Sequence, residues 1–130
     1  MNCTTNPTQQ QAMVLFAHGS RQNTWRMPFD LIAQKVSERH PNVQVALAFL
    51  EFMTPTLAES LKTLADQGIV SISIVPLFFG IGNHVARDLD ALVQDFADAH
   101  PHVQLNVAPA VGQSPVVLDA MADYAGSLLA

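Results

Sequence analysis

Two kinds of hydrophobic pattern alternate along the chain of 130 residues. Short, nearly continuous apolar runs are typical of strands that are buried on both faces. These runs occupy residues 13–17, 43–50, 69–79 and 103–107. After each run, apolar residues recur at spacings of three and four, as on one face of a helix. The inward-facing residues expected on the four helices are Phe29, Ile32, Ala33 and Val36; Leu57, Leu61, Leu64 and Ala65; Val85, Leu89, Leu92, Val93 and Phe96; and Val117, Met121, Tyr124 and Leu128.

Residues that favour helix ends mark the boundaries of these helices. Proline fits the first turn of a helix, and Ser, Thr or Asn can cap the first backbone N–H groups. We therefore expect helices to open at Pro28, at Thr54 and Pro55, at Asn83, and at Ser114 and Pro115. Gly68 is expected to close the second helix, because glycine readily adopts the left-handed conformation that often follows a helix.

The resulting order, βαβαβαβα, predicts an α/β fold. Alternating strands and helices of this kind form a parallel sheet with right-handed crossovers. We expect a small doubly wound, flavodoxin-like sheet of four strands in the order 2-1-3-4, with helices on both faces. Residues 1–12 are polar and carry no hydrophobic pattern, so they are expected to be a disordered leader before a single domain at 13–130.

The motif H-P-x-V-Q occurs twice, at 40–44 and 100–104. Each copy lies where a predicted helix gives way to a strand, which indicates that the chain is built from two related βαβα halves. His40 and His100 then belong to the last turns of helices, where an imidazolium meets the negative end of the helix dipole. We interpret His102 in the same way. These three histidines are therefore not expected to be metal ligands.

Composition narrows the function classes. Hydrophobic residues make up 49% of the chain and charged residues 13%, which is typical of a globular core. The net charge of −5 argues against a nucleic-acid binder or a peripheral membrane protein, because both need a basic surface. Cys3 is the one cysteine, no signal peptide is visible, and no apolar run approaches the ~20 residues of a membrane span. We expect a soluble, cytoplasmic protein in a reducing compartment.

Three residues that can bind a metal or a proton follow the first three predicted strands. In an open parallel sheet, ligands bind beyond the carboxyl ends of the strands. His18, Glu51 and His84 lie at three such ends, which are adjacent in the order 2-1-3-4. Two imidazoles and a carboxylate suit divalent Fe, Co, Ni or Zn better than Mg or Ca. The alternatives are that each histidine is a structural hydrogen-bonding residue and that Glu51 merely ends an apolar strand.

The loops at the same edge predict a pocket for a flat, anionic molecule. Gly80 and Gly82, on either side of Ile81, let the backbone approach such a ligand closely. Phe78 and Phe79 provide an apolar floor, although one of them is expected to complete the core because successive strand residues face opposite ways. The guanidinium groups expected to bind carboxylates at the rim belong to Arg21, Arg26 and Arg87.

The charged residues at this edge also allow a simpler interpretation. Arg87 can pair with a neighbouring aspartate such as Asp88. A nucleotide site is disfavoured, because Val85 stands where a G-x-G-x-x-G motif needs glycine and there is no P-loop lysine.

Four short motifs resemble those of the short, single-domain sirohydrochlorin chelatases, the class II chelatases. They are A-H-G-S-R at 17–21, A-F-L-E at 48–51, V-P-L-F at 75–78 and G-x-H-V-x-x-D at 82–88. The resemblance covers residues 13–128. It implies insertion of Co²⁺, Fe²⁺ or Ni²⁺ into sirohydrochlorin, on the way to cobalamin, sirohaem or related tetrapyrroles, with the metal as substrate and no tightly bound cofactor. Family members of this length usually act as homodimers.

The resemblance also implies roles for particular residues. His18 and His84 correspond to the metal-binding histidines, and His18 is also viewed as a base for the pyrrole protons. Glu51 corresponds to the family's glutamate, and the loop from Phe78 to Asn83 borders the macrocycle. Glu51 or a released histidine would accept the protons. The alternatives are a non-catalytic tetrapyrrole or metal carrier and, less favoured because Ala17 precedes His18, a phosphoryl-transfer enzyme.

Overall fold

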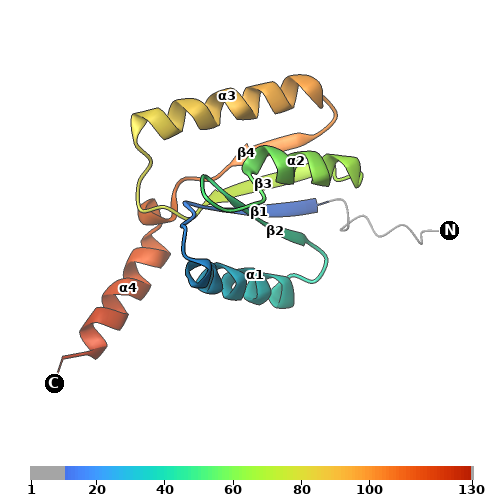
Figure 1. The fold of residues 1–130 in the computed structure, drawn as a ribbon. Helices are drawn as coiled ribbons and strands as arrows, with labels where there is room; N and C mark the ends of the chain where they lie inside the picture. The colour runs from blue at the N-terminus through green and yellow to red at the C-terminus, as the bar shows by residue number, and fades with distance from the viewer. Residues whose placement is uncertain (1–10, 130) are drawn as a thin grey trace.

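A computed structural model describes residues 11–129, and its four strands form one parallel sheet in the order β2-β1-β3-β4 (Figure 1). The strands are β1 (Gln11–Ala17), β2 (Gln44–Phe49), β3 (Ser71–Pro76) and β4 (Gln104–Val107). This confirms the predicted fold class and strand order. The predicted leader at 1–12 overlaps β1, where Ala12 is buried, while residues 1–10 lie outside the described part of the chain.

Within residues 11–129, four helices and two short 3₁₀ turns accompany the strands, and the last turn and the last helix follow β4. The helices are α1 (Met27–Arg39), α2 (Leu57–Asp66), α3 (Asn83–Ala99) and α4 (Pro115–Ser127), and the turns are η2 (Asn23–Arg26) and η3 (Val111–Gln113). Helices α2 and α3 cover one face of the sheet and α1 lies on the other (Figure 1). Within residues 11–129, no helix has the length and apolar character that a membrane crossing requires.

Alternation along β1 divides the core between the two faces. Val14 and Phe16 pack with the residues of α2 and α3, whereas Leu15 and Ala17 pack toward α1. All four are at most 3% exposed, because a strand in the middle of a parallel sheet is covered on both sides. The continuous apolar run that predicted this strand therefore has a direct structural cause.

Helix α2 begins later than expected because a stronger cap follows Pro55. Thr56 and Glu59 form a capping box, in which each side chain accepts a hydrogen bond from the other residue's backbone N–H. The buried Ser60 hydroxyl donates to the Leu47 carbonyl at 3.0 Å and fastens the helix to β2. Gly68, with φ of +85°, follows the helix end as predicted.

Two boundaries around α3 also differ from the expectation. Strand β3 ends at Pro76 rather than near Phe79, although the Leu77 N–H still donates to the Phe16 carbonyl at 2.8 Å. Gly82, in an extended conformation, is the N-cap of α3, and Asn83 is its first helical residue. The cap predicted at Asn83 is therefore wrong by one position, because the extended chain runs as far as Gly82.

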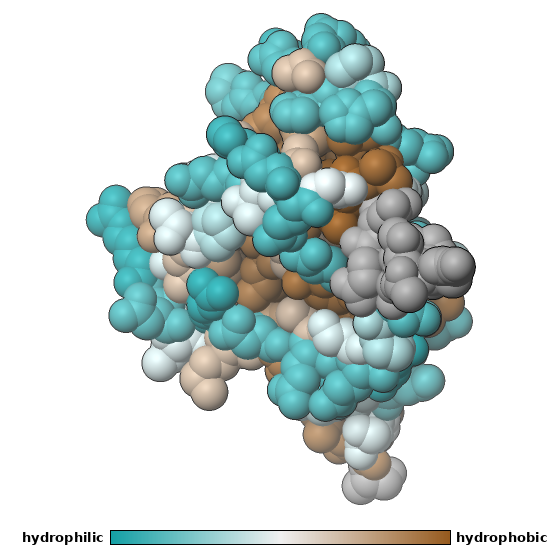
Figure 2. Space-filling model, turned by 90° about the vertical axis from the view of Figure 1, so that its right-hand side faces the viewer, coloured by the Kyte–Doolittle hydropathy of each residue, from teal (hydrophilic) through white to brown (hydrophobic). Residues whose placement is uncertain are grey.

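The two H-P-x-V-Q segments form the same turn. His40 and His100 are the C-caps of α1 and α3, with φ/ψ of −135°/70° and −132°/66°. The N–H groups of Val43 and Val103 donate to the two histidine carbonyls, each at 3.0 Å. Both turns precede the amino end of a strand, at the largely hydrophilic end of the molecule shown in Figure 2. The repeated sequence thus encodes a repeated helix-to-strand turn, and these histidines are helix-end residues as expected.

Helix α4 does not pack as its sequence predicts. It leads away from the sheet (Figure 1), and none of its residues is buried. Met121, Tyr124 and Leu128, expected to face inward, are 46%, 69% and 71% exposed, and Val117 is half-buried. Helical spacing identifies an apolar stripe but does not identify the surface that covers it.

Candidate active site

The carboxyl ends of β1 and β2 bring His18 and Glu51 into contact. The backbone pairing of the two strands continues past them, with the Leu50 N–H donating to Ala17 O at 2.9 Å and the Glu51 N–H to His18 O at 3.1 Å. The His18 Nε2 then lies 3.1 Å from a carboxylate oxygen of Glu51. The two side chains are 56% and 48% exposed, so a ligand can reach them from solvent.

Gly19 allows this close approach. Its φ is +96°, in the left-handed region that glycine tolerates and other residues avoid. A Cβ added at Gly19 would overlap the carbonyl oxygen of Glu51. The glycine of the H-G-S segment is therefore needed to bring the loops after β1 and β2 together.

The contact with Glu51 also determines what His18 can do chemically. When His18 carries its proton on Nε2, it donates a hydrogen bond to Glu51 and leaves the Nδ1 lone pair available for a cation or a proton. The ring of Phe78 meets the His18 ring edge-on, with 6.1 Å between ring centroids, and Phe78 in turn packs against Phe16 at 5.4 Å. The imidazole is thus held between a carboxylate and an apolar wall.

His84 stands apart from this pair. It is exposed in the first turn of α3, after the loop that follows β3. Within residues 11–129, no three His, Cys, Asp or Glu side chains lie close enough together to hold a metal ion. The structure therefore brings His18 and Glu51 together but does not bring His84 to them, and the assignment of His84 as a ligand stays a prediction.

The three predicted arginines have different surroundings. Arg26 is half-buried, and its guanidinium is already hydrogen-bonded within the chain. Its Nε donates to Asp30 at 3.1 Å, and one Nη donates to the Thr54 carbonyl at 3.3 Å. Arg21 is exposed, and its guanidinium lies 4.7 Å from the centroid of the Phe52 ring. Arg87 is exposed on α3 and forms no ion pair with any described residue. Arg21 and Arg87 are thus the more available of the three for an anion.

The predicted macrocycle loop presents its side chains in two directions. Phe78 and Ile81 pack against the core on the α2 and α3 side, whereas Phe79 is 65% exposed and lies on the side of α1 and α4. Gly80, Gly82 and Asn83 are exposed, and a Cβ added at either glycine would contact nothing. The loop therefore leaves open space above Gly80 and Gly82, and neither glycine is required by the packing.

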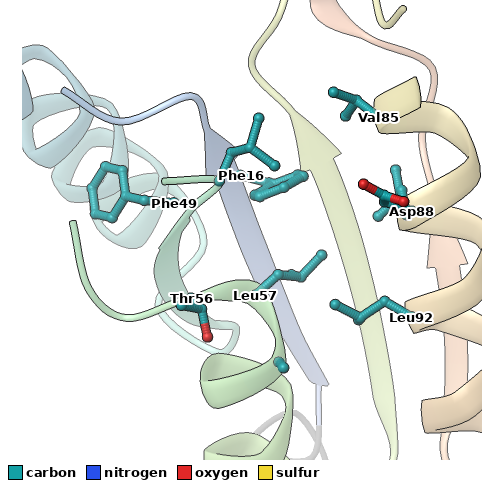
Figure 3. Close-up of a pocket in the computed structure, with 10 residues that line it drawn as sticks. Phe16, Phe49, Thr56, Leu57, Val85, Asp88 and Leu92 are labelled. Carbon is teal, nitrogen blue, oxygen red and sulfur yellow. The ribbon is translucent and has the colours of Figure 1, made fainter. Parts of the chain in front are cut away.

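A cleft between α2 and α3 opens beside the end of the sheet (Figure 3). Its volume is about 130 Å³, and its walls include Phe16, Leu57 and Leu92. The carboxylate of Asp88 points toward this mainly apolar space, which Thr56 also lines. In the sequence, Asp88 belongs to the G-x-H-V-x-x-D motif and is a possible ion-pair partner of Arg87, but it has no predicted role at the site. Its position one helical turn after His84 was the available signal, because residues four apart lie on the same side of a helix.

A family model described as CbiX matches residues 12–127. The chain belongs to the CbiX family. Two curated relatives are the sirohydrochlorin cobaltochelatases of Methanocaldococcus jannaschii, 35% identical over 69% of this chain and 63% of the relative, and of Saccharolobus islandicus, 38% identical over 62% of each chain. This CbiX-family chain therefore matches less than two thirds of their length.

Two solved structures share the fold of this CbiX-family chain. One is from Marinobacter aquaeolei VT8 and is named as a CbiX protein of cobalamin (vitamin B12) biosynthesis. It is 27% identical, with a TM-score of 0.77 over 90% of this chain and 95% of that one. The other is the sirohydrochlorin chelatase SirB from Bacillus subtilis subspecies spizizenii in complex with cobalt, with a TM-score of 0.75 and 21% identity over 91% of this chain and 50% of that one. The comparisons confirm the resemblance read from the four motifs.

Proposed function

We propose that this chain is a chelatase that inserts Co²⁺, Fe²⁺ or Ni²⁺ into sirohydrochlorin in tetrapyrrole biosynthesis. The observation that carries the proposal is the solvent-accessible pair of His18 and Glu51 at the carboxyl edge of the sheet, in a member of the CbiX family. Relatives named sirohydrochlorin cobaltochelatase support the choice of substrate.

The reaction exchanges one divalent cation for two protons. Neutral His18 and His84 hold the incoming metal on one face of the macrocycle, and the metal is a substrate rather than a resident cofactor. Two pyrrole N–H bonds break as two metal–nitrogen bonds form, and both protons leave through side chains at the site. Glu51 or a released histidine accepts each proton in turn and passes it to solvent. His18 Nε2 lies 3.1 Å from the Glu51 carboxylate, so a proton can also move between these two side chains.

The peripheral carboxylates of the macrocycle require cations at the rim. Arg21 and Arg87 supply them from the loop after β1 and from the first turns of α3. Arg26 contributes only if it exchanges its bond to Asp30 for one to the substrate. Phe78 and the loop from Gly80 through Ile81 and Gly82 to Asn83 border the ring. Positioning of this kind lowers the entropy lost on reaching the reactive geometry.

An anaerobic absorbance assay with sirohydrochlorin and Co²⁺, Fe²⁺ or Ni²⁺ in turn tests the proposal. We expect His18→Ala and His84→Ala each to lower the insertion rate by at least about 100-fold. His102→Ala is the matched control, because it removes the same side chain from a turn at the amino end of β4, and it should retain the wild-type rate. Near-normal rates for both site variants would contradict the proposal.

Glu51→Gln separates the two candidate proton acceptors. Glutamine keeps a hydrogen-bonding partner for His18 but cannot accept a proton at neutral pH. A loss as large as that of His18→Ala indicates that Glu51 is the acceptor, while a loss of about tenfold or less indicates that it orients His18. A wild-type rate equal to the protein-free rate, with sirohydrochlorin or metal still bound, would instead support the carrier function.

Assembly and location belong to the same proposal. We propose a homodimer that works in the reducing cytoplasm, in keeping with a sequence whose one cysteine is Cys3.

A further inference from the structure

Helix α4 exposes apolar side chains that its own chain does not cover. None of its residues is buried, and Val116 and Tyr124 are 78% and 69% exposed, with Leu128 at its end 71% exposed. A solvated helix normally pairs an apolar stripe with a charged face, but the charged residues of α4 are only Asp119 and Asp123. An isolated helix of this length is also marginal in water, so α4 needs a surface to pack against.

A groove of matching character runs between α1, the sheet and the first turns of α4. Its volume is about 680 Å³, and every residue that lines it is apolar. The sheet and α1 contribute Met13, Leu15, Val75, Leu77, Phe29 and Ile32. A contiguous apolar surface that is left open to solvent is typical of an interaction site.

The repeat in the fold indicates what the groove accepts. The halves β1-α1-β2-α2 and β3-α3-β4-α4 have the same order and share the H-P-x-V-Q turn. In the first half, α2 packs on the sheet beside α3 and buries Leu57, Leu61 and Leu64. The equivalent place for α4 is on the opposite face beside α1, which is where the groove lies. A helix with the chemistry of α4 therefore fits the groove.

The loop before α4 holds this helix away from its own groove. The Ala108 N–H donates to Ile74 O at 2.9 Å and the Gly112 N–H to Phe78 O at 3.0 Å. A Cβ added at Gly112 would overlap the Phe79 carbonyl, so this crossing is tightly packed. These contacts set the direction of α4 before its first turn, and the helix then runs outward (Figure 1).

The size of a structural neighbour points to a second copy. The fold of this chain fills 50% of the SirB chain, so two copies supply about as much chain as that protein has. Each copy carries both an open groove and an uncovered helix, and such self-complementary surfaces favour a twofold pair.

We propose that two copies of this chain associate reciprocally, with α4 of each lying in the groove between α1 and α4 of the other. This inference rests on the homodimer of the proposed function and identifies its surface, but it does not depend on the reaction. Phe79 lies in the groove next to Phe78, so the docked helix abuts the loop that borders the candidate site.

Analytical ultracentrifugation of the full chain tests the interface. Tyr124→Asp combined with Leu128→Asp places carboxylates where the partner's groove is apolar, and both residues are exposed in the single chain, so its fold is kept. We expect the wild type to sediment as a dimer and the double variant to have a dissociation constant at least about 30-fold higher. Leu31→Asp, a matched change at a half-exposed residue of α1 outside the groove lining, should leave the dimer intact.

Cross-linking distinguishes exchange between chains from closure within one chain. In a Cys3→Ser background, a tagged chain with Ile32→Cys is mixed with a differently tagged chain with Tyr124→Cys, and a short bis-maleimide linker is added. We expect a covalent product that carries both tags. A single chain that carries both Ile32→Cys and Tyr124→Cys is treated with the same linker at high dilution. A cross-link within that chain would show that α4 reaches its own groove.

Three results would overturn the inference: a wild type that is monomeric throughout, a dimer unaffected by the α4 substitutions, or a cross-link formed only within one chain. The chelatase assay on the same samples keeps the two proposals apart. An active monomer contradicts the interface alone, and an inactive dimer contradicts the function alone.

Discussion

Gly19 links the backbone of the candidate site to its chemistry. It lies directly after His18, and its φ of +96° turns the chain so that the loop passes against the Glu51 carbonyl. The relative position of the His18 and Glu51 side chains therefore depends on the backbone conformation of Gly19.

We expect Gly19→Ala to lower the free energy of unfolding by about 2 kcal/mol or more, because alanine is strained at positive φ and its Cβ overlaps backbone. Urea denaturation followed by circular dichroism measures the change. Gly80→Ala is the control, since its Cβ contacts nothing, and its effect should stay within about 1 kcal/mol. Equal stability of the two variants would show that the turn at Gly19 tolerates a side chain.

Single residues of the site were predictable where a strand carries them. His18 and Glu51 follow adjacent strands, and the backbone pairing that joins those strands also fixes the residues just beyond them. His84 follows a loop whose path depends on packing by Phe78 and Ile81, which no periodicity in the sequence describes. The pairing of Arg26 with Asp30 has a visible signal in the sequence, because the two residues are four apart at the start of a predicted helix.

At the scale of elements, α2 shows how local signals fix a helix on the sheet. Its capping box orders the first turn, three leucines face the core, and Ser60 binds the carbonyl of Leu47. This helix forms one wall of the cleft next to the site, so its start also positions that wall.

Thr56→Ala should lower the free energy of unfolding by about 1 kcal/mol, because the first-turn N–H of Glu59 loses its acceptor. Thr63→Ala makes the same chemical change at an exposed position within the helix, where alanine is the better helix former, so stability should be equal or slightly higher. Thermal unfolding of the two variants compares them directly. If Thr63→Ala lowered the free energy of unfolding as much as Thr56→Ala, loss of the helix cap would not explain the effect of Thr56→Ala.

Element types were easier to predict than their ends or their partners. Burial on both faces makes the strands nearly continuous apolar runs, so all four were recognised. The start of α2 was misplaced because two capping signals, at Thr54 and Thr56, lie close together and only the second has the reciprocal Glu59. The outward path of α4 depends on contacts of Gly112 with Phe78 and Phe79, which are distant in sequence.

At the scale of the whole molecule, the two halves of the fold use one turn design with different side-chain packing. The ring of His100 stacks on Phe96 with 4.3 Å between centroids, and its Nδ1 lies 3.2 Å from the Phe96 carbonyl. The equivalent His40 is exposed and, within residues 11–129, makes no side-chain hydrogen bond or ring contact.

His100→Ala should therefore cost about 1 to 2 kcal/mol of unfolding free energy, whereas His40→Ala should change it by less than about 0.5 kcal/mol. Both variants keep the backbone hydrogen bonds of the turn, so the comparison isolates the rings. Chemical denaturation of each variant beside the wild type provides the measurement. Equal losses would mean that the stacking of the His100 ring on Phe96 adds no stability beyond what the exposed His40 ring provides.

The main-chain bonds that extend β1 and β2 beyond Ala17 and Phe49 have a consequence for metal choice. They fix the imidazole of His18 and the carboxylate of Glu51 at a separation set by the sheet. Under the proposed function, cations of different ionic radius are then accommodated on the other side of the site, by the segment after β3 and the start of α3. Discrimination between cobalt, iron and nickel is therefore a property of that segment, and exchanging it between relatives is the direct way to alter it.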